Sequence, residues 1–140
     1  MNKPKTNTTR RFRLIEEYEA AEKAKSSEQI SFGLEDPEDK SLTYWNAMII
    51  GPSGTPYANG LYTVKITAGP DYPIQPPVVK FETKINLPSV NQKSGEVEGK
   101  NFPVIGKWVS TTRIIDILTA LFNEMKVNKN LPQPKEGEKF

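Results

Sequence analysis

The sequence predicts an α+β fold in which two long helices flank four antiparallel strands. Two observations support this prediction. Prolines are absent from residues 5–36 and 104–131, whereas eight of the twelve prolines lie between residues 52 and 103. Because proline breaks a helix interior, long helices are possible only in the two proline-free stretches. Between these stretches, apolar residues recur with a period of two, which is typical of half-buried strands.

The first helix is expected to begin near residue 8 or 9. Its apolar residues recur with the spacing of one helical face, and they are Phe12, Leu14, Ile15, Tyr18 and Ala21. Thr8 or Thr9 would cap the free amides at its start. The acidic residues of the segment are expected on its solvent side, and they are Glu16, Glu17, Glu19 and Glu22.

Four strands are expected next, each bounded by turn residues. Their ranges are 30–34, 42–50, 62–68 and 79–81, where apolar and polar residues alternate or β-branched and aromatic residues concentrate. Short strands that follow one another in this way indicate an antiparallel meander. From residue 85 to residue 107 no period is visible, so this segment is expected to be an extended, packed loop.

The second helix is predicted from an i, i+3, i+4, i+7 stripe. The stripe consists of Ile114, Ile117, Leu118, Leu121 and Met125. Thr111 or Thr112 is the expected cap. The proline-containing stretch from residue 131 onward cannot continue the helix. All 140 residues are therefore expected to form a single domain that stops after its second long helix.

The composition excludes several kinds of chemistry. The chain has no cysteine, so it can form no thioester, no disulfide and no thiolate metal site. It also has no histidine, which removes the commonest general base and zinc ligand. Neither a metal nor a cofactor is expected, and no apolar run reaches the roughly 18 residues of a membrane helix. Residues 1–13 carry five bases and no acid, which we interpret as a solvated tail rather than a nucleic-acid-binding arm.

Three stretches resemble the ubiquitin-conjugating enzyme family. GPSGTPYANGLY over residues 51–62 is similar to the family's turn into its third strand, and YPIQPPVVKF over residues 72–81 is similar to its Tyr-Pro-x-x-Pro-Pro-x-x-x-Phe signature. Trp108 and the apolar stripe after it resemble the segment that follows the family's active site. The resemblance covers about residues 8–130 and implies a ubiquitin-conjugating-enzyme-like fold.

The chain departs from this family at the active site. Active members carry a His-Pro-Asn triplet before the catalytic cysteine, and the matching positions here are Leu87, Pro88 and Ser89. The cysteine position falls at or near Glu98, where a carboxylate cannot hold ubiquitin as a thioester. The chain therefore resembles the short, catalytically inactive ubiquitin-conjugating enzyme variants, and we expect it to have no enzymatic activity of its own.

This resemblance implies a non-catalytic subunit that forms a heterodimer with an active ubiquitin-conjugating enzyme. Such a subunit positions acceptor ubiquitin for the synthesis of lysine-sixty-three-linked chains in DNA-damage tolerance and signalling, with ligases reached through the partner. Its expected location is the cytoplasm and nucleus. Two other functions remain open: a stand-alone ubiquitin- or peptide-binding variant domain of the membrane-sorting kind, and a nucleic-acid binder that uses the basic arm.

The resemblance also implies two sets of contact residues. Partner contact would use the start of the first helix, with Phe12 inserted in a pocket and Arg11 and Arg13 at its rim. Alternatively, Phe12 packs on its own sheet.

The surface expected to bind acceptor ubiquitin consists of Ser31, Asn46, Met48 and Leu61. Asn46 and Met48 are two apart in a predicted strand and so share a sheet face. The alternative is that these four residues are ordinary strand surface.

Overall fold

The computed structural model of the protein describes residues 2–23, 29–58, 60–135 and 137–140, with the backbone alone for residues 2–8 and 23. The elements run in the order α1 (Asn2–Lys23), β1 (Ile30–Leu34), β2 (Tyr44–Ile50), β3 (Leu61–Thr67), β4 (Val78–Phe81), η1 (Gly99–Asn101), α2 (Pro103–Gly106) and α3 (Ile114–Val127). The strands form one antiparallel sheet in the order β1-β2-β3-β4. The predicted α+β meander is therefore confirmed.

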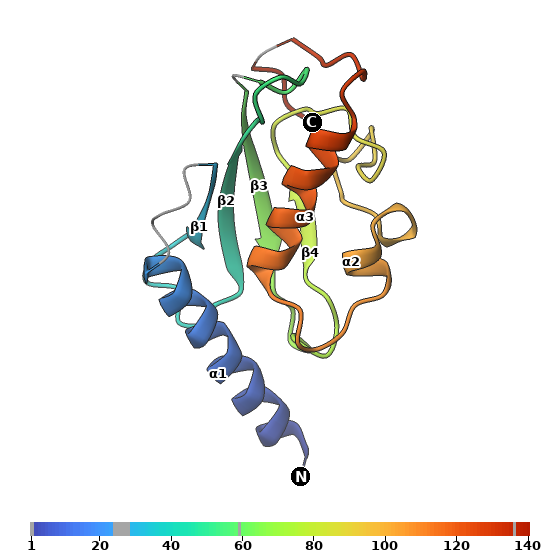
Figure 1. Ribbon diagram of the computed structural model, residues 1–140. Helices are drawn as coiled ribbons and strands as arrows, with labels where there is room; N and C mark the ends of the chain where they lie inside the picture. The colour runs from blue at the N-terminus through green and yellow to red at the C-terminus, as the bar shows by residue number, and fades with distance from the viewer. Residues whose placement is uncertain (1, 24–28, 59, 136) are drawn as a thin grey trace.

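Among the described residues, α3 covers one face of the sheet and no helix covers the other. Figure 1 shows α3 lying across the covered face, while α1 extends away from the body of the molecule. The side chains of β2 and β3 alternate between buried and partly or fully exposed positions, as the period of two predicts. The core lies between the sheet and α3, and α3 contributes Ile114, Ile117, Leu118, Leu121 and Met125.

Two helix starts differ from the predictions. α1 begins at Asn2, earlier than expected. Pro4 is compatible with this start because it lies in the first turn, where an amide N–H would have no partner within the helix. α3 is capped at Arg113 instead of at a threonine. The Asp116 carboxylate accepts the backbone N–H of Arg113 at 2.9 Å, which closes this helix end.

The long loop after β4 has more structure than predicted. It contains η1 and α2, and Val90 and Val97 form an isolated antiparallel bridge within it. Bridges and single helical turns are too short to produce a period in the sequence. Among the described residues, no helix combines the length and apolar character needed to cross a membrane.

Candidate functional site

The position expected for a catalytic cysteine holds a carboxylate with partners of its own. Glu98 immediately precedes η1, and its backbone N–H donates to the carbonyl oxygen of Ser89 at 2.8 Å. Its Oε2 accepts Nδ2 of Asn91 at 3.1 Å, and its Oε1 lies 3.9 Å from Nζ of Lys100. The side chain therefore serves as a hydrogen-bond acceptor in the loop and offers no nucleophile for a thioester.

Of the three residues at the positions expected for the His-Pro-Asn triplet, Leu87 and Ser89 are buried and Pro88 is exposed. Ser89 is fully buried, and its Oγ donates to Oε1 of Glu124 on α3 at 2.6 Å, while its N–H donates to Oε2 at 3.1 Å. Burial raises the pKa of the Glu124 carboxyl, and these two hydrogen bonds act in the opposite direction. Because the Ser89 hydroxyl is occupied by Glu124, it is not free to stabilise an oxyanion near Glu98.

The open face of the sheet, called the outer face below, carries the residues expected to bind acceptor ubiquitin. Ser31 on β1 is paired with Met48 on β2, and Asn46 lies two residues before Met48 on the same strand. A shallow depression of about 340 Å³ is lined in part by these three side chains and by Gly33. Leu61 lies outside the depression and is paired with Ile50 at the end of β2.

The outer face is apolar at several positions. Leu61 is 57% exposed and Met48 is 41% exposed, and the exposed Ile50 lies between them, so these apolar side chains are neighbours on the outer face, as at an interaction surface. Sequence reasoning missed Tyr44 and Ile50, which are exposed on the same face of β2. The period-two alternation that placed Asn46 and Met48 could have identified both. Asn46 Oδ1 is buried with no hydrogen-bond partner among the described residues.

Phe12 lies at the surface of α1. It is 67% exposed, so the alternative in which it packs on its own sheet is wrong. Arg11 is also exposed, and its guanidinium donates to the carbonyl oxygen of Lys40 at 3.0 Å. Arg13 is different, because its side chain is only 12% exposed and donates to the carbonyl oxygens of Ser110 and Thr112. The structure therefore gives Arg13 internal partners, while Phe12 and Arg11 remain at the surface.

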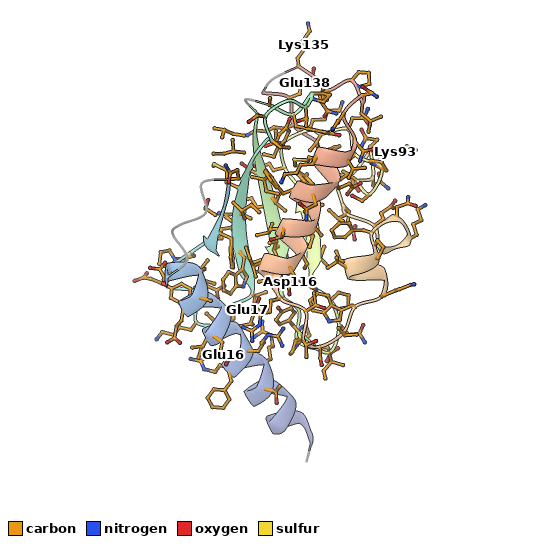
Figure 2. The ribbon with its side chains drawn as sticks, viewed as in Figure 1. Glu16, Glu17, Lys93, Asp116, Lys135 and Glu138 are labelled. Carbon is orange, nitrogen blue, oxygen red and sulfur yellow. The ribbon has the colours of Figure 1, made fainter. Side chains whose placement is uncertain are left out.

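Glu17 is buried, contrary to the expectation that it lies on the solvent side of α1. It is 2% exposed, and Oε1 accepts the backbone N–H of Ile114 at 2.7 Å at the start of α3. Its Oε2 accepts the hydroxyl of Tyr72 and lies 3.3 Å from Nε of Arg13. In Figure 2, Glu17 lies beside the start of α3, where Asp116 is also labelled. We call Arg13, Glu17, Tyr72 and the Ile114 amide the Glu17 cluster.

Burial controls the electrostatics of the Glu17 cluster. It raises the pKa of the Glu17 carboxyl, and the hydrogen bonds from Tyr72 and Ile114, together with the charge of Arg13, oppose the shift. Burial likewise raises the pKa of the Tyr72 hydroxyl, and here the negative charge of Glu17 adds to the shift. The carboxylate also faces the positive end of the α3 dipole, which favours its charged form.

The basic arm is partly tied to the body. Arg10 donates to the carbonyl oxygens of Ser41, Ala68 and Gly69 at 2.8–2.9 Å and to Oγ1 of Thr43 at 3.1 Å. Like Arg11 and Arg13, it is therefore bonded to main-chain oxygens. These three guanidinium groups fasten α1 to the loops of the sheet and to the segment before α3.

Comparisons with known proteins place the chain among close relatives. A family model described as ubiquitin-conjugating enzyme matches residues 13–139. The chain is 44% identical over 133 residues to ubiquitin-conjugating enzyme variant MMS2 of Saccharomyces cerevisiae, across 94% of this chain and 96% of that protein. It is 39% identical over 133 residues to ubiquitin-conjugating enzyme E2 variant 1C of Arabidopsis thaliana, across 94% and 92% of the two chains.

The fold is also similar to that of solved structures. Human ubiquitin-conjugating enzyme E2 G1 superposes with a TM-score of 0.71 at 29% sequence identity. This match covers 81% of the chain and 91% of the human protein. A putative ubiquitin-conjugating enzyme from Plasmodium yoelii superposes with the same TM-score at 28% identity, across 84% and 72% of the two chains.

Proposed function

The chain belongs to the ubiquitin-conjugating enzyme family as a variant without a cysteine, and from this premise we propose that it is the non-catalytic subunit of a heterodimer with an active ubiquitin-conjugating enzyme. The partner carries donor ubiquitin on its own cysteine. The names of the relatives, which are ubiquitin-conjugating enzyme variants, favour this function over a stand-alone domain of the membrane-sorting kind.

The subunit acts by holding acceptor ubiquitin against its outer face. The observation that carries this part of the proposal is the uncovered sheet face with its exposed apolar side chains, in a protein that has no thiol. Ser31, Asn46 and Met48 supply the depression, and Leu61 extends the apolar surface beyond it. The acceptor lysine then attacks the partner's thioester because it is held near that bond, an effect worth up to several kcal/mol. No base from this chain is needed.

The linkage follows from the same geometry. A fixed acceptor presents one lysine to the thioester, and the product we propose is a lysine-sixty-three-linked chain for DNA-damage tolerance and signalling. Ligases reach the complex through the partner, and the complex works in the cytoplasm and nucleus. The exposure of Phe12, which lies midway along α1, supports this helix as the partner contact, with Arg11 at its rim. The side chain of Arg13 is mostly buried, so in this proposal it does not touch the partner.

A pull-down followed by linkage analysis tests the proposal. The tagged protein is incubated with a cell extract, and captured conjugating enzymes are identified by mass spectrometry. The purified pair is then supplied with activating enzyme, ATP and ubiquitin. We expect free chains of a single linkage, made by the pair but not by either subunit alone. Capture of no active conjugating enzyme, or chains of mixed linkage, would contradict the proposal.

A further inference from the structure

α1 is attached to the body by both apolar and polar contacts. Of the described side chains of α1, Leu14 is the fully buried apolar residue, whereas Ile15 and Tyr18 are half-buried against the core. The remaining inward positions are Arg10, which bonds to the sheet loops, and the residues of the Glu17 cluster. Tyr18 also packs edge-on against Trp45 of β2, with the ring centroids 6.4 Å apart, so the polar contacts act together with this apolar packing.

The Glu17 cluster adds a constraint at the start of α3 to those that Arg10 and Arg11 supply at the sheet loops, because hydrogen bonds are directional. The Ile114 amide donates a hydrogen bond of 2.7 Å to Oε1 of Glu17, and the Tyr72 hydroxyl donates a hydrogen bond to Oε2 of the same carboxylate. Such bonds weaken steeply when the donor angle departs from linearity. The two carboxylate oxygens are therefore satisfied together in one orientation of α1 only.

The orientation of α1 determines where Phe12 points. Phe12 is the neighbour of Arg13 in the helix, so it lies about 100° around the axis from a member of the cluster. With a helix radius of about 6 Å including side chains, a rotation of 30° would move the Phe12 ring by about 3 Å. A shift of that size is enough to misplace an aromatic side chain that must enter a pocket.

We propose that the Glu17 cluster is a positioning device that fixes the orientation of α1 and so presents Phe12 to the partner enzyme. This inference rests on the proposed function, because it assigns a role in partner recognition to residues that do not touch the partner. Glu17 and Tyr72 are positioning residues, and Phe12 is the contact residue. In a molecule without the cluster, α1 stays attached through Arg10 and Leu14 but samples several orientations.

The test uses the double variant Glu17→Leu/Tyr72→Phe. It replaces both side chains by apolar groups of similar volume, but it also removes the carboxylate paired with Arg13 and the acceptor of the Ile114 amide, so the free energy of unfolding is expected to fall. Arg13 keeps its bonds to the carbonyl oxygens of Ser110 and Thr112. The milder single variant Tyr72→Phe keeps the test decisive if the double variant does not fold. Val90→Ala is the control, because it opens a cavity in the loop after β4 and lowers stability without touching α1.

Orientation is measured in the isolated protein by electron-spin distance measurements. The chain has no cysteine, so Thr9→Cys on α1 and Lys80→Cys on β4 introduce two clean labelling sites at exposed positions. We expect one narrow distance distribution in the parent and in the Val90→Ala protein. In the Tyr72→Phe and double variants we expect a broadened distribution. Narrow distributions in both variants would overturn the proposal, whether or not a partner has been captured.

Affinity for the active conjugating enzyme captured in the pull-down is the second readout. If α1 is correctly oriented in only a tenth of the double-variant molecules, the apparent Kd rises about tenfold. Val90→Ala should leave the Kd unchanged. Broadened distances with an unchanged Kd would also overturn the proposal. Failure of the parent itself to bind any conjugating enzyme would instead contradict the proposed function, and the distance data would still decide whether the cluster orients α1.

Discussion

Replacement of Phe12 by alanine tests the proposed partner contact, and the structure sets the size of its effect. Phe12 is 67% exposed, so a partner pocket has about two thirds of its surface left to bury. For an aromatic side chain of roughly 200 Å² this is about 130 Å², or roughly 3 kcal/mol at about 25 cal/mol per Å². We therefore expect Phe12→Ala to raise the Kd of the heterodimer by up to about 150-fold.

The same replacement should affect folding only slightly. The buried third of the side chain is worth roughly 1.5 kcal/mol, and the better helix propensity of alanine returns about 0.5 kcal/mol. The free energy of unfolding should thus fall by about 1 kcal/mol, which lowers the Tm by roughly 4 °C.

Calorimetric titration with the captured conjugating enzyme and thermal unfolding of the isolated protein measure the two effects. Val127→Ala is the matched control, because Val127 is 78% exposed and lies at the other end of the molecule, where α3 finishes (Figure 1). It should change neither quantity by much. The reasoning is refuted if Phe12→Ala binds the partner as the parent does, or if its stability falls by about as much as a core truncation, roughly 3 kcal/mol or more.

Three further predictions concern the outer face, the expected cysteine position at Glu98 and the Glu17 cluster. Ser31→Ala/Met48→Ala should leave the heterodimer intact but raise the apparent KM for acceptor ubiquitin, so chain formation recovers at high acceptor concentration; superimposable curves for the variant and parent would remove the acceptor from this face. Glu98→Cys should form no ubiquitin thioester on a non-reducing gel, because the Ser89 hydroxyl is bonded to Glu124 inside the protein. Robust thioester formation would show that the missing cysteine alone accounts for the lost activity. Burial raises the pKa of Glu17 above its ordinary value of 4.5. Between that value and the raised pKa, the folded protein keeps the proton that the unfolded chain has released. The contribution of Glu17 to stability therefore falls as the pH rises through this range. The side chain of Glu17→Gln cannot titrate. Urea unfolding at a series of pH values should therefore show that this variant gains stability relative to the parent from pH 4.5 upward. A difference in the free energy of unfolding that does not change with pH would contradict the assignment.

Much of the fold could be predicted because its signals are local. The alternation in β2 places Trp45 and Ala47 inside and Met48 outside, and proline positions exclude helices from the middle of the chain. The placement of Asn46 and Met48 on one sheet face could be predicted for the same reason, since strand geometry alone puts them on one side. Ser31 and Leu61 were added to them only by the family resemblance. The cap of α3 was missed because Arg113 does not cap through its side chain. There the distinguishing feature is the Asp116 carboxylate three residues later.

The sequence by itself determined that this protein cannot carry ubiquitin as a thioester, and it determined where the four strands and α3 lie. A chain without cysteine has no thiolate to carry ubiquitin, and no packing arrangement can supply one. Only the tertiary structure decided which charged residues of α1 are internal. Glu17 and Glu16 are neighbours of the same type, yet Glu17 is buried because Tyr72 and Ile114, 55 and 97 positions away in the chain, donate hydrogen bonds to it. A buried carboxylate is tolerated only where such partners exist, and residues this far apart come together only when the chain folds.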